Sequence, residues 1–455
     1  MPLLLSLMIL PEGNPASCGE AGSFYCLLAP LDEAGPSAVA SFDVAESGAL
    51  IQGDTFPTGG SGRAMSSEQG LQIDASGRWL LATNNESNDV TVYRMESDGS
   101  LLRVPGSPFP AGPGPMMIAV HPTLPVFYVS NVGDNTIGVF EIGSDGALSS
   151  LQLRAVSGLP RDLEVEPGGN SLYVADMMNG VQGYRISDDG SLSQLLGSPF
   201  SYASSRPYEI EISRSSQLLV LDLDNGLAAF SLDASGSLNL VPGSPLNVGG
   251  FAKSLALSGD DRFAYVGFPF DDQILGFGIT PTAMPSPLAG PSAPVALSLN
   301  QLLVPRGSTR VFAITREART IQTFSVGEDG SLVPEADPTL VVDVEARVPN
   351  GAVFHLRSPA VRFRRGDANA DGAVDLADAI FTLNHLFRSG EAPVCADAAD
   401  ADDTLGLDLT DPIFLLDHLF RSGPGLQPPG SSDCGDDPTP DDLGDCRYPP
   451  NLCAP

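Results

Sequence analysis

A twelve-residue stretch near the C-terminal end has the residue types and spacing of a cation-binding loop. Acidic and amide side chains occupy loop positions 1, 3, 5, 9 and 12, namely Asp367, Asn369, Asp371, Asp375 and Asp378. Gly372 stands at position 6, where the chain must turn sharply, and Ala373 offers its backbone carbonyl at position 7. Calcium prefers such hard oxygen ligands on one compact loop. The spacing therefore predicts a calcium site, and an acidic turn without a metal is the alternative.

The loop is repeated further along the chain. Residues 367–390 align with residues 400–423 at an offset of 33, and both copies end in HLFRSG. The candidate ligands of the second copy are Asp400, Asp402, Thr404, Asp408 and Asp411. Thr404 replaces the acid at position 5, and Leu405 replaces the turn glycine at position 6. We therefore expect weaker calcium binding, or a distorted loop, in the second copy.

One amphipathic helix is expected after the first loop, over about residues 379–388. Its apolar face would carry Ile380, Leu383, Leu386 and Phe387. Paired loop-and-helix units of this kind, covering residues 366–423, resemble the type I dockerin module. The resemblance implies an α-helical calcium-binding domain that assembles with a cohesin-like protein outside the cell.

In dockerins, the residues that recognise cohesin lie at loop positions 10 and 11 and are often Ser or Thr. Here these positions hold Leu376 and Ala377 in the first loop, and Leu409 and Thr410 in the second. Only Thr410 fits the preference. The partner is therefore either a cohesin-like protein or a cell-surface protein, and calcium folds the domain in both cases.

Composition separates this acidic tail from the rest of the chain. The chain has 455 residues, which is more than one domain with a single hydrophobic core usually contains, so at least two domains are expected. The formal net charge is −33, of which −15 falls on residues 366–455. Nucleic acid is excluded as a partner because binding phosphates needs a basic face. No apolar run reaches the roughly 20 residues of a membrane span.

The six cysteines lie near the two ends of the chain, at Cys18, Cys26, Cys395, Cys434, Cys446 and Cys453. Their even number and the absence of a CxxC pair favour disulfides in an oxidising compartment, and hence an exported protein. The last four allow three connectivities. Residues 1–20 are either an export signal without a basic start or a disordered segment. Residues 346–365 read as a linker and residues 424–455 as a Cys-, Pro- and Asp-rich tail.

The long region before the linker repeats with a period in the forties. A DG or SG turn followed by Leu recurs at residues 47–50, 98–101, 145–148, 189–192, 235–238 and 329–332. Before each turn stand an apolar strand, a polar turn and an alternating strand. About four strands per repeat predicts a β-propeller, here all-β and seven-bladed over residues 21–345. A linear β-solenoid would need shorter repeats.

The stretch YVSNVGDNTIGVFEI at 128–142 and the GSPF segments at 106–109 and 197–200 carry a family resemblance. They are similar to YVTN-type propellers, which include the seven-bladed lactonase family related to 6-phosphogluconolactonase. The resemblance implies the fold and a possible site at one mouth of the central channel. It implies no activity by itself, because many such propellers only bind.

No nucleophile elbow, zinc-binding or phosphate-loop motif occurs in the chain. His121 stands in a His-Pro turn between expected strands. Acid–base chemistry would fall to carboxylates and arginines that begin inner strands, namely Arg161, Glu164, Arg206 and Glu209. They either gather at one channel mouth or form ion pairs between blades. No catalytic residue is assigned.

These observations lead to one interpretation and one alternative. The interpretation is an exported, extracellular or cell-surface binding protein that uses its calcium-dependent module for assembly or surface retention. Its propeller would bind an unidentified small molecule or glycan. The alternative is an extracellular hydrolase, either lactonase-like or acting in polysaccharide breakdown, with its site at a channel mouth.

Overall fold

The computed structural model describes residues 22–431 with short gaps, and also residues 434–435, 448–449 and 452–453. The gaps are residues 31–34, 45–49, 64–69, 97–98, 203–205, 224–225, 281, 291, 297, 306, 342–346, 357–362, 389, 405 and 422. The chain divides into two compact units, Met1–Leu356 and Arg357–Pro455. The predicted segment 1–20 lies outside the described residues. No described helix has the length and apolar character to cross a membrane.

The described strands of the first unit form seven antiparallel sheets. The first sheet joins β1 (Gly22–Pro30), β2 (Gly35–Val44) and β3 (Leu50–Gly62) to the last strand, β30 (Arg347–Leu356). The next contains β4 (Leu71–Ile73), β5 (Trp79–Asn84), β6 (Asp89–Met95), β7 (Leu101–Arg103) and β8 (Phe109–Pro110). A third contains β9 (Pro115–Val120), β10 (Val126–Asn131), β11 (Thr136–Ile142) and β12 (Leu148–Ala155).

Four further sheets follow in chain order. The first of these contains β13 (Pro160–Val165), β14 (Ser171–Asp176), β15 (Gly180–Ile186) and β16 (Leu192–Gln194). Next come β17 (Pro207–Ile212), β18 (Gln217–Asp222), β19 (Gly226–Leu232) and β20 (Leu238–Leu240). Then come β21 (Ser254–Leu257), β22 (Phe263–Phe268), β23 (Gln273–Thr280), β24 (Ala283–Pro287) and β25 (Ala293–Pro294). The last contains β26 (Leu299–Leu303), β27 (Arg310–Thr315), β28 (Thr320–Val326) and β29 (Leu332–Val341).

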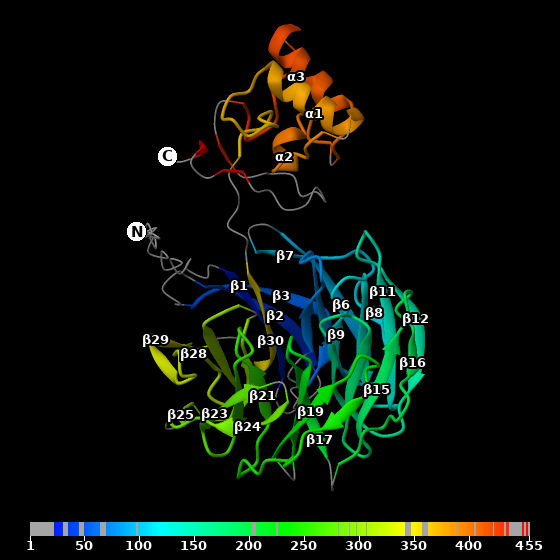
Figure 1. Cartoon of the computed structure of the whole chain (residues 1–455), viewed down its shortest axis with the longest axis vertical. Helices are drawn as coiled ribbons and strands as arrows, with labels where there is room; N and C mark the ends of the chain where they lie inside the picture. Colours follow the sequence, from blue (N-terminus) through cyan, green and yellow to red (C-terminus); the bar gives the residue numbers. More distant parts are fainter. Residues whose placement is uncertain are drawn as a thin grey trace, which may run out of the picture. The chain divides into compact units, whose positions relative to one another are not determined.

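The innermost strands of the sheets contact one another in a closed cycle, from β4 through β9, β13, β17, β21 and β26 to β30 and back to β4. The predicted all-β propeller is thereby confirmed. The ring closes where the last strand pairs with the first, because Phe24 lies opposite Phe354 and Tyr25 opposite Val353 (Figure 1). Closure removes exposed sheet edges. Residues 347–356 therefore belong to the propeller, and the predicted linker at 346–365 was wrong over this stretch.

The repeated DG turns fasten neighbouring sheets together. Gly190 and Gly330 in these turns have φ of 83° and 82°, a region that favours glycine. A Cβ on Gly330 would lie 2.5 Å from the ring of Phe263 in the adjacent sheet. The carbonyl of Gly190 accepts a hydrogen bond from the Tyr128 hydroxyl at 3.0 Å. The turn motif is repeated because each of these turns packs against the adjacent sheet in the same way.

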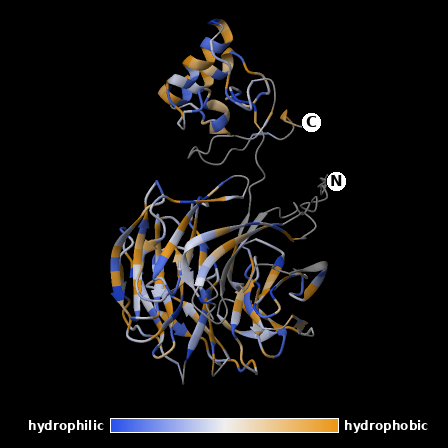
Figure 2. Cartoon of the chain, turned by 180° about the vertical axis from the view of Figure 1, so that it is seen from behind, coloured by the Kyte–Doolittle hydropathy of each residue, from blue (hydrophilic) through white to orange (hydrophobic). Residues whose placement is uncertain are grey.

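Tyrosines make this contact in four places. Tyr25, Tyr128, Tyr173 and Tyr265 donate to the carbonyls of Gly99, Gly190, Gly236 and Gly330 at 3.0, 3.0, 2.6 and 3.0 Å, respectively. Apolar side chains fill the space between the sheets, and apolar and polar residues alternate along many strands (Figure 2). The core is therefore a set of layers between sheets, which leaves the inner ends of the sheets around a channel.

The second unit contains α1 (Leu376–Arg388), α2 (Ala396–Ala399) and α3 (Thr410–Arg421). A disulfide joins Cys434 to Cys453, and Cys395 is also disulfide-bonded. The predicted helix at 379–388 exists and begins three residues earlier. Its predicted apolar face is not buried, because Ile380 and Phe387 are 49 % and 64 % exposed. Ala379 and Thr382 are buried instead, because they lie on the side where α1 contacts α3.

Candidate active site in the central channel

The pairing of each innermost strand with its neighbour shows which residues occupy equivalent positions along the channel. Asp162 lies opposite Ala175, Glu209 opposite Leu221, Ser254 opposite Gly267 and Gln301 opposite Ile314. The residue just before each of these positions lies near the start of its strand, at one end of the channel. These preceding residues, with the equivalent position of β9, are Met116, Arg161, Tyr208, Lys253 and Asn300, and we call them the channel ring.

Arg161 joins three neighbouring strands of the ring. Its Nη2 donates to the Tyr208 hydroxyl at 2.9 Å, and its Nη1 contacts Sδ of Met116 at 3.4 Å. The guanidinium also lies over the Tyr208 ring, 4.7 Å from the centroid. Because Arg161 is only 8 % exposed, its charge acts where little water screens it. A carbonyl oxygen that gains negative charge would be stabilised at this position.

Lys253 supplies a second buried cation to the ring. It is the only lysine of the chain and is 7 % exposed. Its Nζ donates to Oδ1 of Asn300 at 2.7 Å. Asn300 is fully buried, and its Nδ2 has no hydrogen-bond partner among the described residues. A buried amide donor without a partner is costly, so a ligand acceptor at this end would satisfy it.

The nearby carboxylates of Glu209 and Asp162 join adjacent innermost strands. Oε2 of Glu209 accepts the backbone N–H of Leu255 at 2.6 Å, and Oδ2 of Asp162 accepts that of Ile210 at 2.9 Å. Burial raises the pKa of Asp162 to about 7, although its backbone hydrogen bonds and Arg161 oppose the shift. Both side chains bridge adjacent innermost strands. Glu209 thus forms at least one bond from its side chain to the backbone of the next strand.

The four acidic and basic candidates from the sequence do not gather at one mouth. Arg161 and Glu209 lie near the channel ring, and Arg206 lies exposed two residues before Tyr208. Glu164 stands three residues after Arg161, ~10 Å further along the strand. It lines the opposite part of the channel together with Glu211. The alternative of one cluster of all four residues is therefore wrong, because Glu164 lies further along its strand than Arg161.

The opposite part of the channel is a cavity of about 450 Å³. All seven innermost strands line it, through residues such as Gln72, Ala119, Glu164, Glu211, Ala256, Leu302 and Ala352. Its charged lining is acidic, with Asp261 beside the two glutamates. The cations Arg161 and Lys253 thus lie near the start of the inner strands, whereas Glu164 and Glu211 lie further along them.

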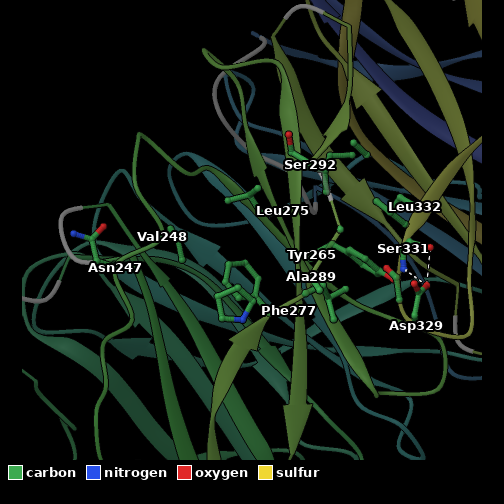
Figure 3. Close-up of a pocket in the computed structure, with 17 residues that line it drawn as sticks. Asn247, Val248, Tyr265, Leu275, Phe277, Ala289, Ser292, Asp329, Ser331 and Leu332 are labelled. Atoms are coloured by element: carbon green, nitrogen blue, oxygen red, sulfur yellow. Dashed lines mark hydrogen bonds between the residues drawn. The ribbon is translucent and has the colours of Figure 1, made fainter.

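A second pocket of about 290 Å³ lies between β23, the 287–293 segment and the 329–332 turn (Figure 3). Apolar side chains such as Val248, Leu275 and Leu332 line it. Oδ1 of Asp329 accepts hydrogen bonds from the Ser331 backbone at 3.0 Å and hydroxyl at 2.6 Å, which hold its pKa below the usual range. The carboxylate is thus engaged in its own turn. The pocket lacks the convergent polar groups of a reactive site.

His121 is a structural residue, as its turn sequence predicts. Its Nδ1 accepts the backbone N–H groups of Thr123 at 3.1 Å and Leu124 at 2.9 Å. The proton therefore sits on Nε2, which donates to the Gly169 carbonyl of the next sheet at 2.9 Å. Burial lowers the pKa of His121, and the bond to Gly169 and the charge of Glu166 oppose this shift. The neutral ring fastens two sheets.

The lowered pKa of His121 predicts that this residue stabilises the folded propeller at neutral pH and does so less at acidic pH. The folded state favours the neutral ring, so this effect is complete above the unfolded pKa of about 6.5 and is lost as pH falls through the lower folded value. We expect His121→Ala to destabilise the propeller by about 2 kcal/mol at pH 7.5 and by less at pH 5. Urea unfolding read by the fluorescence of Trp79, the single tryptophan, measures this difference. His418→Ala is the control, and an equal penalty at both pH values would contradict the assignment.

Comparison with known proteins agrees with this architecture. A family model for lactonases with a seven-bladed β-propeller matches residues 108–198. Among curated relatives, the 6-phosphogluconolactonases of Yersinia pestis and Yersinia pseudotuberculosis are each 25 % identical over 153 residues. The match covers 31 % of this chain and 46 % of each relative, so the chain spans about half the length of the curated relatives it matches.

The first unit is a β-propeller, and its residues 108–198 are similar to lactonases with this fold. Two solved structures have the same fold. A candidate 6-phosphogluconolactonase from Bacteroides uniformis has a TM-score of 0.62 and 17 % identity, and covers 74 % of this chain and 99 % of its own. The periplasmic gluconolactonase of Pseudomonas aeruginosa has a TM-score of 0.56 and 16 % identity, with 73 % and 99 % covered. At these identities the likeness shows the fold alone.

Sequence reasoning missed four members of the channel ring, namely Met116, Tyr208, Lys253 and Asn300. The repeat offset contained a signal for them. The segments LPRDLEVE, RPYEIEIS and FAKSLALS align when each inner strand is shifted by one repeat. Arg161, Tyr208 and Lys253 then occupy one column. Reading that column across the repeats, instead of searching for local motifs, would have identified the ring.

The first tail loop has its ligand side chains turned inward onto its own backbone. The two carboxylate oxygens of Asp367 accept the N–H groups of Asp371 at 3.0 Å and Gly372 at 2.8 Å. Asp378 similarly accepts from Asn369 at 3.1 Å and Asp375 at 2.8 Å. Burial raises the pKa of Asp378 to about 6. The loop is compact, and Gly372 has the positive φ of 91° that its tight turn requires.

The second tail loop gathers three carboxylates. Asp400, Asp402 and Asp411 each place one oxygen within 4.8 Å of the others. Asp400 and Asp411 are fully buried, and Oδ2 of Asp400 and Oδ1 of Asp411 have no partner among the described residues. Burial, reinforced by Asp400, raises the pKa of Asp411 to about 8. Buried carboxylates without partners fit a divalent cation, so the donor set suits calcium.

The two loops differ in how closely their carboxylates approach one another. The sequence favours the first loop, whereas the carboxylates converge in the second. Thr404, at position 5, donates its hydroxyl to Oδ1 of Asp402 at 2.7 Å and so helps to orient that ligand. Leu405, where the turn glycine is missing, lies outside the described residues. Bound calcium would neutralise the charge of these carboxylates. Asp400, Asp402 and Asp411 would supply its oxygen ligands.

Proposed function

We propose that the lactonase-like propeller hydrolyses a lactone at the channel ring. The buried cations Arg161 and Lys253 are the observation that supports this proposal. The lactone carbonyl oxygen would accept hydrogen bonds from them and from Nδ2 of Asn300. Preorganised donors around a developing oxyanion are usually the largest single contribution to such catalysis.

In this reaction water adds to the carbonyl carbon, and negative charge collects on the carbonyl oxygen. The ring C–O bond then breaks, and the former ring oxygen leaves as a hydroxyl group. The product is an open-chain hydroxy carboxylate, and one proton is released to solvent. Because Glu209 and Asp162 are engaged with backbone N–H groups, the chain contributes chiefly by stabilising the oxyanion.

Proton release in a pH-stat tests this proposal. Purified full-length protein is offered sugar lactones and aliphatic lactones, among them δ-gluconolactone and δ-valerolactone. We expect saturable proton release above that of boiled protein with at least one of them. Traces that match boiled protein across the whole panel would contradict the hydrolase and leave a binding propeller as the better account.

The second unit supports a separate proposal, a calcium-dependent dockerin-like module that docks on a cohesin-like or cell-surface protein. The converging carboxylates of the second loop favour calcium. Matched positions of the two repeats also expose large apolar side chains, at Leu376, Ile380 and Phe387 on α1 and at Leu409, Ile413 and Phe420 near α3. Such residues suit a protein partner. Export and a role in polysaccharide breakdown remain parts of this proposal.

A further inference from the structure

Exposed aromatic side chains stand beside the channel ring. Phe251 lies two residues before Lys253, so their Cα atoms are at most roughly 7 Å apart. Phe270 lies in the turn between β22 and β23 of the same sheet. The two side chains are 40 % and 78 % exposed, and their ring centroids are 5.5 Å apart with an interplanar angle of 43°. They form an aromatic pair on the rim of the channel.

The neighbouring repeats locate this pair at the same end of the channel as the ring. Phe268 pairs with Gln273 as Asp176 pairs with Gly180, so the turns after β22 and β14 correspond. Phe270 and Met178 stand two residues into these turns, and Met178 is 74 % exposed. The strands run antiparallel, so these turns lie at the end where the innermost strands begin. That end carries Arg161, Tyr208 and Lys253.

The pair has no structural purpose that burial would explain. Phe270 keeps most of its surface in water, so it adds little to the core. Phe251 and Phe270 therefore place apolar surface at this rim. Apolar surface next to a few convergent polar groups is the composition of a small-molecule site.

We propose that the aromatic pair Phe251–Phe270 binds the substituent of an apolar-substituted lactone while the lactone carbonyl meets Lys253 and Arg161. The substrate class is thus a lactone with an aryl or alkyl group, rather than a polyhydroxylated one. Phenylalanine rings offer no hydrogen bond to hydroxyl groups, but they stack well on another ring. This inference rests on the proposed function, which it deepens by naming the substrate class.

A matched pair of substrates tests the inference in the full-length protein. 5-Phenyl-δ-valerolactone and δ-valerolactone share the reacting ester and differ only in the apolar group. We expect wild type to prefer the phenyl compound in kcat/KM and Phe270→Ala to lower this preference at least about tenfold. Phe270→Leu should keep part of it. Leu196→Ala is the control, because Leu196 is an exposed apolar residue in the loop after β16.

Binding measured by saturation-transfer NMR separates this inference from the hydrolase proposal. Turnover with an unchanged preference in Phe270→Ala would overturn the inference and leave the hydrolase intact. Binding of the phenyl lactone that is lost in Phe270→Ala, together with no turnover of any lactone in the panel, would uphold the aromatic site and overturn the hydrolase. No binding of the phenyl lactone to wild type would overturn the aromatic site. Because Phe270 is mostly exposed, its replacement should leave the fold unchanged, and the Trp79 unfolding curve checks this.

Discussion

Replacing Arg161 by methionine is expected to lower kcat/KM for lactone hydrolysis by about 10²- to 10³-fold. Removing one preorganised donor from an oxyanion site has an effect of this size. Methionine keeps much of the side-chain volume, and its sulfur can pack against Met116 and Tyr208. The loss should fall mainly on kcat, because the donor acts most strongly on the charge that develops in the transition state.

The matched control is Arg185→Met, which removes an arginine from β15 that hydrogen-bonds only to the Ser235 carbonyl among the contacts described, at 3.1 Å. It should leave kcat/KM within about twofold of wild type, since Arg185 lies outside the channel ring. Tyr208→Phe should cause a smaller loss than Arg161→Met, because it removes the 2.9 Å bond that positions the guanidinium and keeps the charge. A folded Arg161→Met protein with wild-type kcat/KM would contradict the site.

Calcium is expected to stabilise the second unit, and Asp411→Asn should remove most of the contribution of the second loop. A ligand that binds only the folded state at a hundred times its Kd adds about 2.7 kcal/mol of stability. Without calcium the substitution should be harmless, because burial disfavours the ionised form of Asp411 and asparagine keeps the shape. Calorimetric titration of the chelator-treated full-length chain measures the stoichiometry. Wild type should bind about two calcium ions, and the variant about one.

Asp417→Asn is the matched control on the same helix. Asp417 is half exposed and pairs with Arg421 at 3.2 Å, one turn away on the surface. Its replacement should leave the calcium stoichiometry unchanged, because exposed pairs of this kind contribute little. If calcium titration of the wild-type chain gives no heat signal, calcium binding is contradicted. Loss of the second ion in both variants would show that Asp411 has no special role.

Local patterns determined much of this protein from sequence. The repeated DG turns predicted the propeller because each turn needs glycine at positive φ and serves one repeat. The spacing of Asp400, Asp402 and Asp411 predicted a cation loop because the ligands lie on twelve consecutive residues. His121 was correctly interpreted as a turn residue from its His-Pro context. In each case the information lay within one short segment.

Only the tertiary structure decided which residues from distant segments meet. Arg161, Tyr208 and Lys253 lie in three successive repeats, and ring closure alone brings them to one end of the channel. Closure also requires β30 to pair with β1 across more than 300 residues, which no local pattern announces. The exposure of Ile380 and Phe387 depends on where α3 packs against α1. Burial and convergence are properties of packing between elements, so a local pattern fixes the elements but not the faces that they bring together.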